Sequence, residues 1–159
     1  MSLLLKKMLG FAPEITKCVF LGDMYTAKNK AFFELHDIKT VINATPDVPN
    51  YFENDVKYIR VPVHDSMKEK DLELMAKCLP DLVKFLKHET DKNEPVLIHC
   101  VAGRQRSAII VAVFLCTKFN ISLNDAYKLL LSIKPDVFNY GNNMNFYLSA
   151  KYFLDDNHL

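Results

Sequence analysis

The chain has 159 residues, of which 50% are hydrophobic, and a formal net charge of +1. This length fits one domain, and this composition is sufficient for a sizeable core. The near-zero net charge excludes a general attraction to nucleic acid or to an anionic membrane, so any affinity for phosphate must be local. No apolar stretch reaches membrane-spanning length, and the N-terminus lacks a signal-peptide pattern. We therefore expect a soluble, cytoplasmic protein that does not bind membranes.

Cysteine usage also points to an intracellular protein. The four cysteines form no Cys-x-x-Cys pair, and they are Cys18, Cys78, Cys100 and Cys116. This pattern is typical of a reducing compartment, where a free cysteine packs as a small hydrophobic residue. We predict core packing for every cysteine except Cys100.

The first half of the chain alternates predicted helices and strands. Residues 2–10 are expected to form a short amphipathic helix, which either covers the core or exchanges with a second subunit. Apolar runs rich in β-branched residues predict three strands, over residues 16–21, 39–43 and 58–63. A helix over residues 27–36 separates the first two strands.

The middle of the chain contains the longest predicted helix and the most apolar strand. A polar loop over residues 64–71 follows the third strand. Apolar positions at helical spacing then predict a helix over residues 72–88, which Pro80 should kink or interrupt. Residues 96–98 read as a buried strand, and residues 108–119 read as a buried helix.

The last part of the chain is predicted to be helical. Ser122 resembles the first residue of a capping box, which starts a helix through Leu131. Residues 136–141 form a loop, and Asn142 or Asn143 caps a final helix.

This alternation predicts an α/β fold: residues 1–159 form a single domain with a central, largely parallel sheet flanked by helices on both faces. Ligands of such sheets bind outside the carboxyl ends of the strands. The loops after Val63 and after His99 both fall at that edge, so we place the functional site there.

The loop after His99 has the parts of a phosphate site. Cys100 precedes the predicted helix, where the helix dipole and backbone N–H groups favour an ionised thiol. Gly103 permits a tight turn, and Arg106 can bind two phosphoryl oxygens with its planar fork. Backbone N–H groups would bind the remaining charge. The expected phosphate-binding residues are Val101, Ala102, Gly103, Arg104, Gln105 and Arg106.

Phosphate-ester cleavage also needs a general acid and support for the nucleophile. Ser107 can donate a hydrogen bond to the Cys100 sulfur, and His99 can hold the loop. Asp65 is our choice for the acid because it follows a neighbouring strand. Asp71 and His64 are the alternatives, although Asp71 more naturally begins a helix and His64 reads as a surface histidine.

Residues 99–107 (HCVAGRQRS) resemble the protein tyrosine phosphatase signature, HCxxGxxR followed by Ser or Thr. The Ala-Gly and Arg-Ser pairs are similar to those of the dual-specificity phosphatase branch. Further similar segments are Val19–Gly22 with Ala27, Ile42–Asn43, Tyr58–Asp65, and Asn143 with Phe146. Residues 93–97 are similar to the corresponding segment of poxvirus dual-specificity phosphatases.

The resemblance implies a two-step mechanism without a metal or other cofactor. Cys100 would attack phosphorus and form a phosphocysteine, while Asp65 would serve as general acid and then as general base. Asn143 would support the site. The short chain implies a shallow pocket that admits phosphotyrosine and phosphoserine/threonine of protein substrates. The protein would act as a monomer, or as a homodimer formed through its N-terminal segment.

Two residues depart from the family pattern. Gln105 stands where the branch often has Ser. Arg104 adds a charge at the crest of the loop, where it is either solvated or selects an acidic substrate. A second hypothesis is therefore a phosphatase of the same superfamily that acts on RNA 5′-phosphates or phosphoinositides, although no nucleic acid partner is expected. A third is a catalytically inactive phosphate-binding module, which would need neither Cys100 nor Asp65.

Overall fold

A five-stranded sheet in the order β1-β2-β5-β3-β4 organises the structure, a computed structural model that describes residues 2, 4 and 11–157. The strands are β1 Glu14–Thr16, β2 Val19–Gly22, β3 Thr40–Asn43, β4 Lys57–Arg60 and β5 Val96–His99. The β2–β5, β5–β3 and β3–β4 pairs are parallel, whereas β1 pairs antiparallel with β2. The predicted largely parallel sheet is confirmed. The predicted helix over residues 2–10 falls almost wholly outside the described residues.

The central strands are buried on both faces. Along β5, Val96 and Ile98 point into the larger apolar cluster, while Leu97 between them points into the smaller one. In β2, Phe20 is directed to the smaller cluster and both its neighbours to the larger. Successive strand residues face opposite sides, so continuous apolar runs such as these require cover on both faces.

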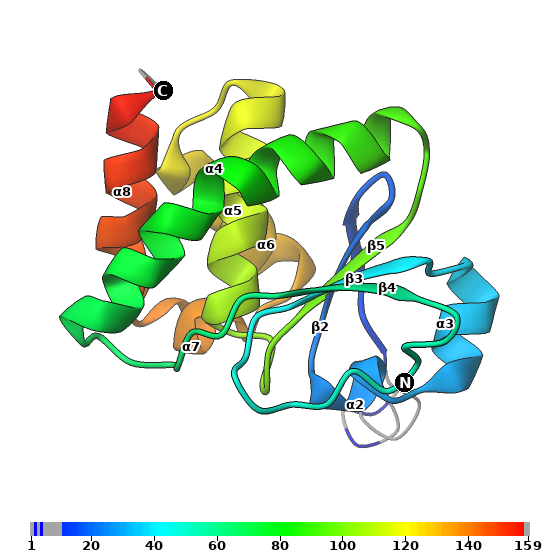
Figure 1. The fold of residues 1–159 in the computed structure, drawn as a ribbon. Coiled ribbons are helices and arrows are strands. Elements are labelled where there is room, and N and C mark those ends of the chain that lie inside the picture. Colours follow the sequence, from blue (N-terminus) through cyan, green and yellow to red (C-terminus); the bar gives the residue numbers. More distant parts are fainter. Residues whose placement is uncertain (1, 3, 5–10, 158–159) are drawn as a thin grey trace.

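Helices supply that cover (Figure 1). Figure 1 shows α4, α5, α6 and α8 grouped on one side of the sheet and α2 and α3 on the other. The helices are α2 Met24–Ala27, α3 Lys30–His36, α4 Glu69–Asp91, α5 Arg106–Phe119, α6 Leu123–Ile133, α7 Val137–Gly141 and α8 Tyr147–Asp156.

Within the described part of the chain, no single helix is long and apolar enough to span a membrane; α5 and α6 pass this test only together, bent by 119°. The α5 helix is the central one, with residues 106–116 buried.

Two segments differ from their predicted form: residues 16–21, predicted as one strand, and residues 136–141, predicted as a loop but containing the short helix α7. The strand predicted over residues 16–21 is a hairpin, because Cys18 adopts a left-handed conformation with φ of 68° and turns the chain between β1 and β2. The helix α4 runs unbroken through Pro80 and changes direction midway in Figure 1, so of the two predicted outcomes, a kink and an interruption, the structure has the kink. Proline removes one helical hydrogen bond. Buried Met75, Leu79 and Val83 hold both halves of α4 against the core, so the helix continues.

Helix capping was predicted correctly at one helix and wrongly at another. The Asp125 backbone N–H donates to Ser122 Oγ over 3.1 Å, as predicted for the start of α6. The α8 helix begins only after Phe146, which provides no side-chain cap, so neither Asn142 nor Asn143 caps it. The side chain of Asn143 instead hydrogen-bonds to other asparagines.

Candidate active site

The candidate nucleophile lies between the carboxyl end of β5 and the beginning of α5. Cys100 directly follows β5 and is 2% exposed. Its Sγ lies 3.1 Å from Oγ of Ser107, in the first turn of α5. The strand and the helix are both fully packed in the core, so this sulfur sits in a rigid frame. The structure therefore brings together the two residues that were predicted to work as a pair.

In the loop from residue 101 to residue 105, the carbonyl groups of residues 101, 103 and 104 accept hydrogen bonds from elsewhere in the fold. The Val101 carbonyl accepts from the Met24 N–H over 3.0 Å, and the Arg104 carbonyl accepts from the Phe138 N–H over 2.7 Å. Lys134 Nζ donates to the Gly103 carbonyl over 2.9 Å.

In a trans peptide the C=O and the following N–H point in opposite directions, and the described chain has no cis peptide bond. The N–H groups of residues 102, 104 and 105 therefore point away from these donors. They have no hydrogen-bond acceptor among the described residues. Successive N–H groups without acceptors, next to a helix N-terminus, can form an anion site.

Gly103 makes this backbone path possible. Its φ is +68°, and a Cβ built on it would lie 2.7 Å from the Gly22 carbonyl oxygen. Both the left-handed conformation and this close approach to the end of β2 exclude a side chain. The predicted role of Gly103 thus has a defined structural reason.

Arg106 connects the loop to the strand-end loop that carries Asp65. The Arg106 side chain is buried, and its Nη1 donates to the Val63 carbonyl over 3.0 Å. Its Nε is buried and has no acceptor among the described residues. Because an unpaired buried donor is costly, this nitrogen is suited to bind an anionic oxygen.

His99 is fully buried behind the nucleophile. Its Nδ1 lies 3.1 Å from the Cys100 carbonyl oxygen, which agrees with the predicted role of holding the loop. Burial lowers the pKa of His99 to about 4, against the opposing effect of the Cys100 carbonyl. The imidazole is therefore neutral at physiological pH.

This buried imidazole predicts a loss of stability in mild acid. An unfolded chain takes up a proton at His99 below its ordinary pKa of 6.5, whereas the folded protein resists protonation down to about 4. The free energy of unfolding should therefore fall by about 2 kcal/mol between pH 7 and pH 5 from this residue alone. Urea unfolding at the two pH values measures the change. A His99→Gln variant should show a smaller decrease, and an equal decrease in both proteins would contradict the prediction.

The three candidate acids occupy different positions. Asp65 is exposed, and its Oδ1 accepts a hydrogen bond of 2.9 Å from Asn145 Nδ2. Asp71 is 3% exposed and accepts from the His64 N–H at 3.1 Å and from Ser66 Oγ at 2.6 Å. Burial opposes ionisation of Asp71, but these hydrogen bonds outweigh it and lower its pKa. Both Asp71 oxygens are therefore engaged in shaping the loop, while Asp65 faces solvent.

Gln105 and Asn143 are brought together across the fold. Gln105 is 2% exposed, and its Nε2 donates to the Asn143 carbonyl over 2.9 Å. Its Oε1 accepts from the Asn145 N–H, also over 2.9 Å. Asn145 is a residue that the sequence analysis missed. No local signal marks it, because Gln105 and Asp65, the partners that connect it to the site, are distant in the chain.

Arg104 is paired with other residues at the rim of the loop. Its Nε lies 3.4 Å from Asp136 Oδ2, and its guanidinium lies 5.2 Å from the centre of the Tyr140 ring. Lys134 also binds Asp136, over 2.7 Å. The positive charges beside the loop are thus partly neutralised by one carboxylate.

The other cysteines have inert environments. Cys18 and Cys116 are buried, Cys78 is half-buried, and all are free thiols. Burial raises the pKa of Cys116 to about 11 and also raises the pKa values of Cys18 and Cys78. These three thiols stay protonated at neutral pH, which agrees with core packing.

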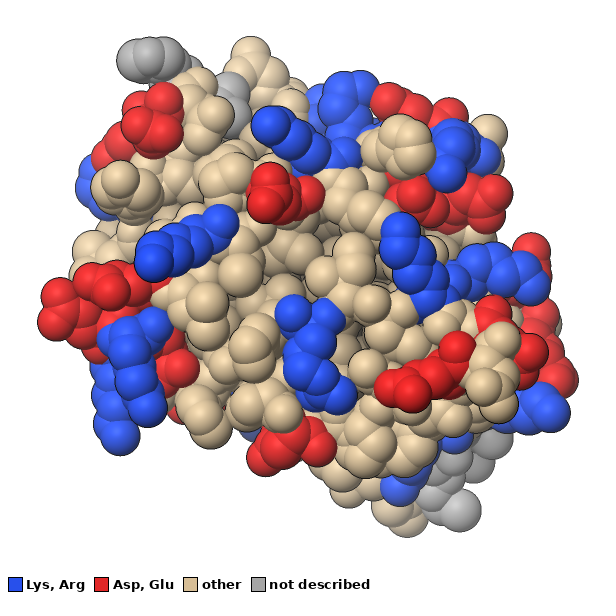
Figure 2. Space-filling view, in the orientation of Figure 1, with Lys and Arg blue, Asp and Glu red and all other residues tan. Residues whose placement is uncertain are grey.

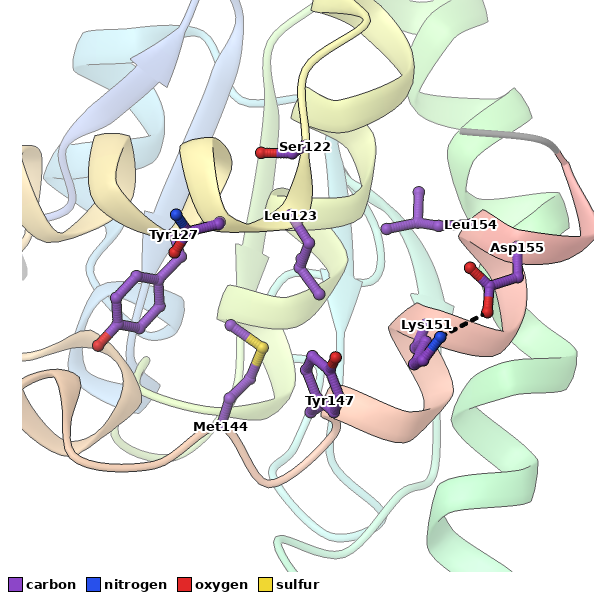
Figure 3. A pocket seen from close by; sticks show the side chains of 9 residues that line it. Ser122, Leu123, Tyr127, Met144, Tyr147, Lys151, Leu154 and Asp155 are labelled. Atoms are coloured by element: carbon purple, nitrogen blue, oxygen red, sulfur yellow. Dashed lines mark hydrogen bonds and ion pairs between the residues drawn. The ribbon is translucent and has the colours of Figure 1, made fainter.

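An apolar groove lies between α6 and α8 (Figure 3). It has a volume of about 520 Å³ and includes Tyr127, Met144, Tyr147 and the Lys151–Asp155 ion pair. Its described lining comes from α6, α8 and the segment before α8. The loop around Cys100 contributes nothing to that lining, so the groove is separate from the candidate chemistry.

The site joins a buried cysteine and an arginine in one loop between a parallel strand and a helix. This arrangement is that of the cysteine-based protein tyrosine phosphatase superfamily. The chain belongs to the dual specificity phosphatase family, because the model of that family's catalytic domain matches residues 19–151. The resemblance to the dual-specificity phosphatase branch is thereby confirmed.

Curated relatives agree with this family. The chain is 33% identical over 130 residues to dual specificity protein phosphatase 6 of Homo sapiens, covering 80% of this chain and 33% of that protein. It is 33% identical over 121 residues to dual specificity protein phosphatase Mpk3 of Drosophila melanogaster, covering 75% of this chain and 28% of that protein. The chain thus spans about a third of the length of these relatives.

A solved structure supports the fold. The crystal structure of human DUSP28 matches with a TM-score of 0.80 at 20% identity, covering 93% of this chain and 95% of the other. At this identity the match establishes the α/β fold alone.

Proposed function

We propose that the chain is a metal-independent protein phosphatase that hydrolyses phosphotyrosine and phosphoserine/threonine. The observation that carries this proposal is the loop around Cys100. It combines a sulfur 3.1 Å from Ser107 Oγ with loop N–H groups and an Arg106 Nε that have no acceptor among the described residues. A thiol beside donors for phosphoryl oxygens fits nucleophilic attack on a phosphate ester.

In the proposed first step, the Cys100 sulfur forms a bond to phosphorus while the bond between phosphorus and the leaving oxygen breaks. Asp65 gives its proton to that oxygen. The N–H groups of the loop and Arg106 bind the phosphoryl oxygens, where negative charge is concentrated in the transition state.

In the proposed second step, water attacks phosphorus and Asp65 takes its proton. The sulfur–phosphorus bond breaks, and inorganic phosphate leaves. Ser107 Oγ is close enough to donate a hydrogen bond to the departing sulfur. Asp65 gives one proton and later takes one back, and the electron pair of the sulfur–phosphorus bond returns to Cys100. The two steps therefore need no reactant besides the phosphate ester and water.

The alternative substrates, RNA 5′-phosphates and phosphoinositides, depended on Arg104. Its pairing with Asp136 and Tyr140 reduces its availability to an anion. Basic and acidic side chains are mixed over the face seen in Figure 2, without a broad basic area. An extended polyanion would find little long-range attraction on such a face. Protein substrates are therefore favoured.

A substrate panel tests the proposed function. Phosphate release should be measured from phosphotyrosine and phosphothreonine peptides, phosphoinositides and 5′-triphosphorylated RNA. Both peptides should be hydrolysed, vanadate should inhibit the reaction, and EDTA should leave it unchanged. Release only from RNA or from phosphoinositides would replace the proposal with the second hypothesis. Binding without release from any substrate would favour an inactive phosphate-binding module.

The free thiols also support a reducing compartment, and we propose the cytoplasm as the location. Burial makes disulfide exchange of Cys18 and Cys116 unfavourable, while Cys100 must stay reduced to act as a nucleophile.

A further inference from the structure

Gln105 connects the candidate phosphate loop to a segment that is distant in the sequence. Its buried amide donates to the Asn143 carbonyl and accepts from the Asn145 N–H, each over 2.9 Å. Both partners are backbone groups, and a backbone carbonyl only accepts while a backbone N–H only donates. The orientation of the Gln105 amide is therefore unambiguous. These two hydrogen bonds fix the backbone of residues 143–145 relative to the loop.

From this fixed segment, the Asn145 side chain reaches Asp65. Its Nδ2 donates to Asp65 Oδ1 over 2.9 Å, while its Oδ1 accepts from Asn143 Nδ2. Asn143 Oδ1 in turn accepts from Asn139 Nδ2 over 2.7 Å. All three amides donate in one direction, toward the carboxylate. Hydrogen bonds aligned in this way strengthen one another, and the last is assisted by charge.

This arrangement leaves a single oxygen of Asp65 for proton transfer. The Asp65 side chain is exposed, and among the described residues its side chain accepts a hydrogen bond only from Asn145, which lies outside its own loop. Hydrogen bonds to Asp71 hold only the neighbouring His64 and Ser66. Asn145 occupies Oδ1 and leaves Oδ2 to carry the proton. Gln105 is the neighbour of Arg106, which would hold the phosphate. The path from Gln105 through Asn145 therefore sets the position of the Asp65 carboxyl group relative to the phosphate site.

We propose that Gln105 and Asn145 are positioning residues that orient the Asp65 carboxyl group toward the leaving oxygen. The inference rests on the proposed function, in which Asp65 is the general acid. Proton transfer depends steeply on the distance and direction of the acid. Loss of either residue should therefore impair the protonation of the leaving group while sparing the attack by Cys100.

The test compares two aryl phosphates as substrates of the full chain. Phenyl phosphate has a weakly acidic leaving phenol that needs a proton, whereas 2,4-dinitrophenyl phosphate releases a phenolate that needs none. The readout is the ratio of kcat/KM for phenyl phosphate to kcat/KM for 2,4-dinitrophenyl phosphate, because kcat/KM includes no step after the leaving group departs. Asp65→Asn should lower this ratio by about 100-fold. Asn145→Ala and Gln105→Leu should each lower it by about tenfold, since the acid is displaced but still present.

Two further measurements separate positioning from a general structural effect. In the Asp65→Asn background, Asn145→Ala should change the ratio by less than about twofold, because the group that it orients is gone. The matched control is Asn157→Ala, which removes a 2.8 Å hydrogen bond to the Phe153 carbonyl at the far end of α8. This control should keep the wild-type ratio.

The outcomes distinguish this inference from the proposed function. If Asp65→Asn lowers the ratio but Asn145→Ala and Gln105→Leu do not, the positioning role is wrong and the acid assignment stands. An unchanged ratio in Asp65→Asn would overturn the acid assignment and the inference with it. If Gln105→Leu fails to fold, the half-buried Asn145 still decides the question.

Discussion

Replacing Cys100 with serine should reduce phosphate release from a phosphotyrosine peptide by about 10⁴-fold or more. A serine hydroxyl is essentially un-ionised at neutral pH, so the loop would hold a substrate without attacking it. The loop N–H groups and Arg106 are unchanged in this variant, and phosphopeptide binding should stay within a few-fold of the wild type. Stopped assays of released phosphate and a titration with labelled phosphopeptide measure the two quantities separately.

Cys78→Ser is the matched control for this substitution. Cys78 is a half-buried free thiol in α4 with a raised pKa and no contact with the candidate site. Its replacement should leave turnover within about twofold of the wild type, as is usual for a substitution outside the site. Turnover retained by Cys100→Ser would reject the nucleophile assignment. Loss in both variants would indicate a general sensitivity to loss of a thiol.

Arg106→Lys should lower kcat/KM for the same peptide by about 10²–10³-fold. Lysine keeps the charge but loses the planar fork, so it cannot bind two phosphoryl oxygens while also donating to the Val63 carbonyl. The loss should affect both KM and kcat, because the phosphoryl group is bound in the ground state and more strongly in the transition state.

Arg60→Lys provides the control for the arginine substitution. The Arg60 side chain donates to the Thr45 carbonyl over 3.0 Å at the end of β4, so it also makes a side-chain to backbone bond. Its replacement should leave kcat/KM within a few-fold of the wild type. A decrease of less than tenfold in Arg106→Lys would show that the fork is not essential. Urea unfolding of both variants checks that each is folded under the assay conditions.

Local patterns predicted most of the elements, because each depends on neighbouring residues. The short apolar run before Cys100 predicted a buried strand, and the longer apolar run after Ser107 predicted a buried helix. Ser122 identified the start of α6 because a cap bonds within the same turn. The hairpin at Cys18 was missed because the left-handed residue there is neither glycine nor asparagine.

Pro80 shows how tertiary packing limits the effect of a local rule, because α4 bends midway but is not interrupted. The missing hydrogen bond costs a limited amount, whereas the buried side chains on both halves of α4 favour a continuous helix. Asp71 is a second example. Its sequence position suggested either an acid or a helix start, and only burial with two donors showed that it shapes the loop at residues 64–66.

The sequence by itself determined the family, the α/β fold and the loop with Cys100, Gly103, Arg106 and Ser107. Those residues lie within one strand-to-helix turn, so their spacing specifies their geometry. Only the tertiary structure decided what surrounds this loop: the Arg106 bond to Val63, the pairing of Arg104 with Asp136, and the path from Gln105 through Asn145 to Asp65. Such contacts join segments far apart in the chain, and no local pattern encodes which distant backbone group a buried amide will meet.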